Sequence, residues 1–173
     1  MVQLMTPSRR PAPDWAGSAV FSPCLTWRYL LTRTWLGEGI TVNFIGANPS
    51  TADADVSDPT VRRMEGFARS HGAARLLVTN VFGFRSTDPR GLQLTDDPVG
   101  PETDHYLLES ARAADITVAT WGLIGLQFER ARHVLRLLEG IPLQCLGHTA
   151  IGAPRHPLYV RGDTALTPYG LAR

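Results

Sequence analysis

Polar residues able to bind a ligand follow an apolar segment early in the sequence. Gly46-Ala47-Asn48-Pro49-Ser50 comes directly after ITVNFI at 40–45. A glycine lets the backbone approach a ligand closely, and an asparagine side chain both donates and accepts hydrogen bonds. The segment lacks the second glycine and the lysine of a phosphate-binding loop. It therefore either contacts a ligand or forms an Asx turn that ends a strand.

Three carboxylates, Asp53, Asp55 and Asp58, follow within six residues. Such a group can bind a hard cation or supply a general base. Their spacing is not that of a calcium-binding loop, and a solvated loop of capping residues is the alternative. Asp58 stands before Pro59, the arrangement expected at the start of a helix.

One histidine and one arginine lie in segments where a ligand contact is expected. His156-Pro157 follows Gly152 and Pro154, which restrict the loop and fix the imidazole. A fixed histidine can donate a hydrogen bond to a developing anion, although a structural or exposed role is the alternative. Arg85 comes just past a predicted strand and can contact a phosphate, unless it is ordinary surface charge.

The elements that must position these residues alternate between strand and helix. An α/β domain with a mainly parallel sheet is the fold class that this alternation predicts. We expect a hairpin between the first two strands around Gly37-Glu38-Gly39. Ligands bind at the carboxyl ends of such strands, so Gly46, Asn80, Trp121 and His156 should line one crevice. The predicted strands are 25–36, 40–46, 74–80, 115–122 and 142–147, and the predicted helices are 59–72, 102–114 and 123–140.

Length and composition favour one domain. The chain has 173 residues, of which 43% are hydrophobic, and its net charge of +1 excludes a strongly basic nucleic-acid coat. We expect a loose N-terminal arm at 1–23 and one domain at 24–173. No run reaches the roughly 18 apolar residues of a membrane span. Two cysteines cannot build a disulfide framework, and the sequence shows no signal-peptide core, so we expect a cytoplasmic protein.

Several longer segments resemble a known family. They are GANPSTADADVSDPTVRR, TNVFGFRSTDP, DPVGPETD, TWG and LGHTAIGAPRHPLYV, which together span roughly residues 25–165. They resemble the bacterial and phage domain-of-unknown-function family 1643, whose name carries no activity. The order of motifs is also similar to the uracil-DNA glycosylase superfamily: a G-x-[D/N/E]-P motif at 46–49, an asparagine ending the next strand at Asn80, a W-G pair at 121–122 and an H-P motif at 156–157.

The second resemblance implies a fold and a chemistry. The fold would be a three-layer α/β/α domain around a four-stranded sheet, here with an N-terminal hairpin or edge strand. Asn48 would position a water, and His156 would stabilise the departing base. The acidic loop has no counterpart in that superfamily, and its Asp53 would replace or assist Asn48. No metal or other cofactor is implied. Leu158-Tyr159 departs from the usual H-P-S run, and either residue would fill the gap left by a flipped base. The implied substrate contacts are Gly46, Pro49, Ser50, Asn80, Arg85, Trp121 and Tyr159.

Three functions remain open from the sequence. The first is a DNA glycosylase-like hydrolase that flips a modified or deaminated base and cleaves its bond to the sugar. The second is a non-catalytic module that recognises a base or nucleotide. The third is an enzyme acting on free nucleosides or nucleotides. The expected partner is thus DNA or a nucleotide-like small molecule, with no membrane association, and the sequence does not specify the oligomeric state.

Overall fold

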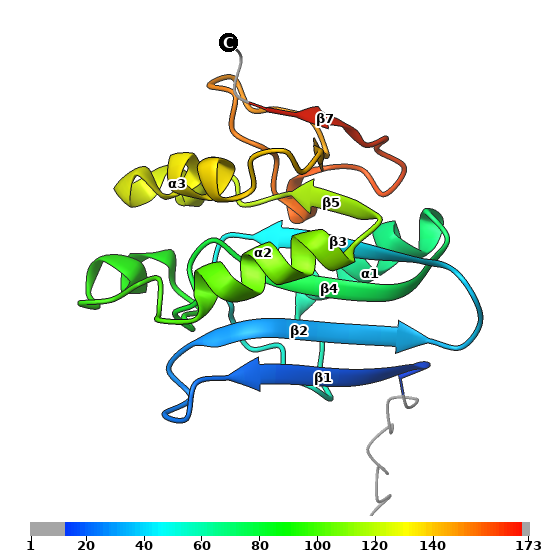
Figure 1. The fold of residues 1–173 in the computed structure, drawn as a ribbon, viewed down its shortest axis with the longest axis horizontal. Helices are drawn as coiled ribbons and strands as arrows, with labels where there is room; N and C mark the ends of the chain where they lie inside the picture. The colour runs from blue at the N-terminus through cyan, green and yellow to red at the C-terminus, as the bar shows by residue number, and fades with distance from the viewer. Residues whose placement is uncertain (1–12, 171–173) are drawn as a thin grey trace, which may run out of the picture.

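The computed structural model describes residues 13–170, which form one seven-stranded mixed sheet (Figure 1). The order of the strands is β1-β2-β4-β3-β5-β6-β7. The middle four, β4, β3, β5 and β6, run parallel, while β1, β2 and β7 pair antiparallel with their neighbours. The sheet is larger than the expected four strands, because antiparallel strands extend this parallel centre at both sides. The strands are β1 Trp15–Phe21, β2 Arg28–Trp35, β3 Ile40–Gly46, β4 Ala73–Asn80, β5 Ile116–Ala119, β6 Leu143–Cys145 and β7 Thr167–Tyr169.

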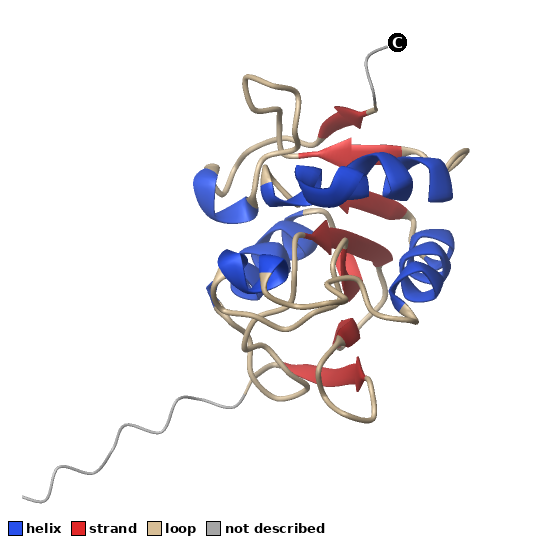
Figure 2. Ribbon diagram, turned by 90° about the vertical axis from the view of Figure 1, so that its left-hand side faces the viewer, coloured by secondary structure: helices blue, strands red, loops and turns tan. Residues whose placement is uncertain are grey.

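Helices cover both faces of the sheet (Figure 2). They are α1 Pro59–Ser70, α2 Thr103–Ala113 and α3 Arg130–Leu137 in the described residues, with short 3-10 turns at Pro89–Gln93, Ile124–Glu129 and Pro157–Tyr159. Phe44 of β3 packs with α1, and its neighbour Ile45 packs with α2 and α3. This alternation along β3 places the two hydrophobic clusters on opposite faces of the sheet.

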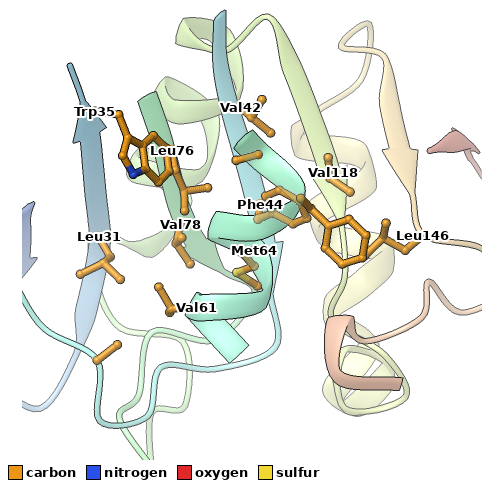
Figure 3. Packing of buried hydrophobic residues seen from close by; sticks show 13 residues of the cluster. Leu31, Trp35, Val42, Phe44, Val61, Met64, Leu76, Val78, Val118 and Leu146 are labelled. Atoms are coloured by element: carbon orange, nitrogen blue, oxygen red, sulfur yellow. The ribbon is translucent and has the colours of Figure 1, made fainter. Parts of the chain in front are cut away.

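Helix α1 forms where the sequence predicts it. The Asp58 carboxylate accepts a hydrogen bond from the Val61 backbone nitrogen at 2.8 Å, and Pro59 occupies the first turn. A buried stripe made by Val61, Met64 and Phe67 faces the sheet. Figure 3 shows Val61 and Met64 beside Val78 and Phe44. The helix is thereby held with its amino end beside the carboxyl ends of β3 and β4.

The expected hairpin between the strands at 25–36 and 40–46 is wrong. β2 pairs with β1 and β4, and β4 lies between β2 and β3. Gly39, directly before β3, packs closely against the start of β4: an added Cβ would lie 2.4 Å from the Gly72 carbonyl oxygen and 2.7 Å from the Ala74 nitrogen. The glycine-rich segment at 37–39 predicted a tight turn between two adjacent antiparallel strands. In the structure it connects β2 to β3 across the position of β4.

The predicted arm at 1–23 also needs correction. Residues 15–21 form β1, the edge strand, which pairs along most of β2. The remainder of the predicted arm at residues 1–12 lies outside the described residues. The N-terminal hairpin of this molecule is therefore β1–β2, and its second strand reaches the sheet interior.

The predicted helix at 123–140 is broken. A 3-10 turn at Ile124–Glu129 precedes α3, and Phe128 and Glu129 have left-handed φ values of 55° and 56°. Leu126, in the 3-10 turn, is 40% exposed. Strand β7 had no alternating pattern to predict it. In the described residues no helix is long and apolar enough to cross a membrane.

Candidate functional site

One cavity of about 660 Å³ lies at the carboxyl ends of β3, β4 and β5. It brings together most of the sequence-predicted site residues, namely Gly46, Asn48, Ser50, Asn80, Trp121, His156 and Tyr159. Pro49, Asp53 and Arg85 do not line it. Its walls include apolar side chains from α1 and β4, Val61, Met64 and Val78. Thr87 and Asp58, one of the three carboxylates of the acidic loop, also line it. Arg28, Thr60 and Arg155 line it as well, and we had not predicted them as site residues.

Asn80 lies deep in the cavity, where its side-chain amide has a fixed orientation. The residue is 6% exposed, and its Oδ1 accepts a hydrogen bond from Arg28 Nη2 at 3.2 Å. Because a guanidinium only donates, the oxygen must face Arg28 and the Nδ2 must point away. A Cβ on Gly46 would lie 2.7 Å from that Nδ2. Gly46 is thus needed for the close approach of β3 to the amide.

Asn48 holds two loops together. Its Nδ2 donates to the Ser86 carbonyl at 2.9 Å and to the Pro49 carbonyl at 3.1 Å. The Pro49 carbonyl also accepts from the Ser86 nitrogen at 2.9 Å, which is the role the structure gives Pro49. The Asn48 amide nitrogen is committed to backbone, so Oδ1 is the atom left to contact a ligand.

The acidic loop divides into a structural and a cavity-lining carboxylate. Asp53 Oδ1 accepts from the Asp55 and Val56 nitrogens at 2.9 and 2.8 Å, and these bonds lower the Asp53 pKa. Arg33 holds the same turn through the Asp53 carbonyl at 2.8 Å. Asp58, in contrast, lines the cavity while capping α1. The carboxylate available to a ligand is therefore Asp58.

His156 is arranged as a neutral hydrogen-bond donor. Its Nδ1 accepts from the Leu158 nitrogen at 3.3 Å, so the ring proton is on Nε2. Burial lowers the His156 pKa, although the charge of Asp58 partly opposes this. Arg63 of α1 donates to the Pro157 and Val160 carbonyls and fixes the loop that carries the imidazole.

The loop before His156 is held by its own backbone. The Thr149 nitrogen donates to the Ala153 carbonyl at 2.8 Å, and the Arg155 nitrogen donates to the Gly147 carbonyl at 2.9 Å. Beyond His156, Leu158 is 43% exposed and Tyr159 is 79% exposed. Large apolar side chains therefore stand in solvent beside the cavity mouth.

Trp121 forms a buried wall of the cavity. It is fully buried, and its Nε1 has no hydrogen-bond partner in the described residues. A Cβ on Gly125 would lie 2.1 Å from Trp121 Cδ1, so the 3-10 turn must have a glycine there. The missing side chain at Gly125 thus makes room for the indole.

Arg28 lines the cavity from β2, although it is only 2% exposed. Its Nη1 donates to the Ala52 carbonyl at 2.8 Å. Burial lowers the Arg28 pKa to about 10, which leaves it protonated at neutral pH. No sequence signal distinguishes Arg28 from Arg33, because both are charged residues in the same predicted strand.

Arg85 lies in a shallow depression next to the cavity. The depression shares Ser50, Ser86 and Thr87 with the cavity lining. The Arg85 guanidinium is 4.8 Å from the centre of the Phe21 ring, and Nη1 donates to the Leu25 carbonyl at 3.1 Å. Arg85 is therefore placed beside the cavity mouth and outside the cavity.

Comparisons with known proteins give a family and no activity. Within residues 13–170, no three His, Cys, Asp or Glu side chains form a group able to hold a metal ion. No curated protein and no solved structure matches the chain, so these comparisons give no support to the resemblance to uracil-DNA glycosylases. The model of DUF1643, described as a protein of unknown function, matches residues 28–158. The chain therefore belongs to the DUF1643 family.

Proposed function

We propose that this protein is a glycosylase-like hydrolase that holds a modified or deaminated base of DNA in its cavity and cleaves the bond to the sugar. The observation that carries this proposal is the arrangement of His156: a neutral imidazole that presents Nε2–H in a cavity shared with two asparagine amides. Such a donor can form a hydrogen bond to an anion that develops in the transition state, and it keeps its own proton while doing so.

The base would enter between polar and apolar walls. Trp121, Met64 and Val78 supply apolar surface, and Asn80 presents its Nδ2 to the edge of the base. An extruded base is read in this way, by hydrogen bonds to its edge and contacts to its faces. These contacts support base recognition as the first step.

The water would be held by Asn48 and Asp58. Asn48 Oδ1 accepts one water hydrogen, and the Asp58 carboxylate accepts the proton released as the water oxygen bonds to the sugar carbon. The electron pair of the broken carbon–nitrogen bond leaves with the base, next to His156. Asp58 thus takes the role that we expected of Asp53.

The surroundings of the cavity support a nucleic-acid substrate. Leu158 and Tyr159 are exposed at the mouth and can fill the gap left by a flipped base. Arg85, in the adjoining depression, is placed to contact a neighbouring phosphate. A strand of DNA would then cross the mouth from the His156 loop to the Arg85 loop.

The test is incubation with oligonucleotides that carry a panel of modified and deaminated bases, followed by alkaline cleavage at abasic sites. We expect strand scission at one class of base, unchanged by a divalent-ion chelator and lost in His156→Ala. Scission with none of the bases, or equal scission by His156→Ala, would contradict the proposal. Binding to an oligonucleotide without scission would instead indicate the recognition module.

The size of the cavity favours a second candidate, an enzyme acting on free nucleosides or nucleotides. At about 660 Å³ the cavity lies within the range of roughly 300–1,000 Å³ typical of whole small-molecule ligands, so there is room for a sugar beside the base. Release of free base from nucleosides or nucleotides, faster than from any oligonucleotide, would support this candidate over the first.

A further inference from the structure

Three arginines are buried in the described residues, and their partners differ. Arg33 pairs with Glu65 at 3.4 Å, and Arg130 pairs with Asp104. Arg28 makes no ion pair with any described residue. A buried charge is costly unless an opposite charge or a set of hydrogen bonds compensates it. Arg28 is also the member of this group that lines the cavity.

The hydrogen bonds of Arg28 go to neutral oxygen atoms and not to a carboxylate. Nη1 and Nη2 donate to neutral oxygens, the Ala52 carbonyl and Asn80 Oδ1, at 2.8 and 3.2 Å. Nε is buried and has no partner in the described part of the chain. Asp58 is the acid with the largest influence on Arg28, but its Oδ1 is committed to the Val61 nitrogen. The cavity therefore has a charged floor, formed by Arg28 and Asn80, which no carboxylate of residues 13–170 contacts.

We infer that this charged floor is a leaving-group site: Arg28, acting through Asn80, stabilises the negative charge that develops on the departing base. The hydrogen bond from Nη2 to Asn80 Oδ1 polarises the amide and makes Nδ2–H a stronger donor. This inference rests on the proposed function. It adds a second anion-stabilising group to His156 and makes Arg28 a positioning residue that fixes the orientation of Asn80.

The step balances without a new reactant. The water oxygen bonds to the sugar carbon, the carbon–nitrogen bond breaks, and its electron pair remains on the base. Asp58 takes the water proton. Arg28 keeps its own protons throughout and lowers the energy of the base anion, which is protonated by solvent after release. The stabilisation is absent in the ground state because the bound base is then neutral.

The first test varies the acidity of the leaving base. Oligonucleotides carry the cleaved base with ring substituents of increasing electron withdrawal, and single-turnover rates are measured. Arg28→Gln should be about 100- to 1,000-fold slower on the least acidic base, as for loss of one preorganised donor. The deficit should shrink as the base becomes more acidic. Arg28→Lys should recover part of the rate because it restores the charge.

Two further variants distinguish a role of Arg28 in the reaction from a role in the stability of the fold. Arg75→Gln removes an exposed arginine near the amino end of β4 and should leave the rates unchanged. Asn80→Asp gives the buried Arg28 an ionic partner and keeps an oxygen that accepts its hydrogen bond. The same substitution removes the Nδ2 donor. This variant should keep the thermal stability of the wild type and show the same acidity-dependent deficit as Arg28→Gln.

A binding measurement separates failure of the inference from failure of the proposed function. Urate, a free base that is anionic at neutral pH, and neutral hypoxanthine are titrated while the NMR signal of the Arg28 Nε–H group is followed. We expect tighter binding of urate than of hypoxanthine, and loss of this preference in Arg28→Gln. That result, together with no scission of any oligonucleotide, would support an anion-binding role for the charged floor and contradict the proposed glycosylase activity. Wild-type acidity dependence in Arg28→Gln, or no preference for urate, would overturn the inference.

Discussion

The imidazole of His156 is the single group on which the proposed reaction depends most. His156→Ala should lower the single-turnover rate by roughly 100- to 1,000-fold, because its partner anion exists only in the transition state. Substrate affinity should stay close to that of the wild type, as a binding titration can show. His105→Ala, an exposed change on α2, is the control and should match the wild type in both measurements.

Protonation of His156 should make the reaction rate fall at acidic pH. Protonation of His156 would break the bond that Nδ1 accepts from Leu158. Because burial lowers the His156 pKa, the rate should be constant above about pH 6.5, the ordinary value, and fall at lower pH. The unfolded chain binds this proton more readily, so the free energy of unfolding also falls as the pH drops from about 6.5 through the lowered pKa. An acid limb of the rate centred above pH 6.5 would contradict this assignment.

The two aspartates of the acidic loop should respond differently to the same change. Asp58→Asn keeps the helix cap, since asparagine caps as well as aspartate, but removes the proton acceptor. We expect the rate to fall by about 100- to 10,000-fold, the usual contribution of a general base, with little change in thermal stability. Asp53→Asn alters a carboxylate outside the cavity and should leave the rate unchanged. Equal rates in the two variants would remove Asp58 from the mechanism.

At the scale of elements, local signals predicted some parts of the structure and missed others. Helix α1 was predictable because its cap, its first-turn proline and its buried stripe all indicate the same helix. The segment at 123–140 has helical periodicity, yet Gly125 must pack against Trp121, and this contact is invisible in the sequence around it. The pairing of β2 with β4 likewise depends on residues more than 40 positions apart. Tertiary contacts decided both cases.

Replacing two glycines by alanine should change the stability of the protein in opposite directions. Gly125→Ala would place a Cβ 2.1 Å from Trp121 Cδ1 and should cost about 1–3 kcal/mol of stability by overpacking. It should also weaken ligand binding, because Trp121 is a cavity wall. Gly66→Ala meets nothing within 4 Å on α1 and should stabilise the protein by about 0.5–1 kcal/mol. Urea unfolding of both variants measures the two effects, and destabilisation by Gly66→Ala would contradict the argument.

Across the whole molecule, the cavity follows from one topological rule. The carboxyl ends of parallel strands meet at one edge, which is why Gly46, Asn80 and Trp121 were predicted to lie together. The rule does not extend to Arg28, because β2 is antiparallel to β4 and contributes its amino end to the same place. The antiparallel additions to the sheet therefore supplied the site residue that the sequence could not indicate.

The net charge of the whole molecule leads to a prediction about the salt dependence of DNA binding. The net charge of +1 provides little general attraction, so binding should depend on a few arginines near the cavity. Arg85→Ala should weaken binding to an oligonucleotide and reduce the slope of log affinity against log salt by about 1, as expected for one lost phosphate contact. Arg112→Ala, an exposed change on α2, is the control. An unchanged slope in Arg85→Ala would place the DNA elsewhere.

The insertion of β4 between β2 and β3 also has a consequence for biosynthesis. The β1–β2 hairpin leaves the ribosome before β4, but its inner edge pairs with β4, which ends at Asn80. Until that strand emerges, β2 presents an unpaired edge, and the guanidinium of Arg28 has no amide oxygen to contact. The nascent chain is therefore exposed to aggregation and to chaperone binding until β4 emerges.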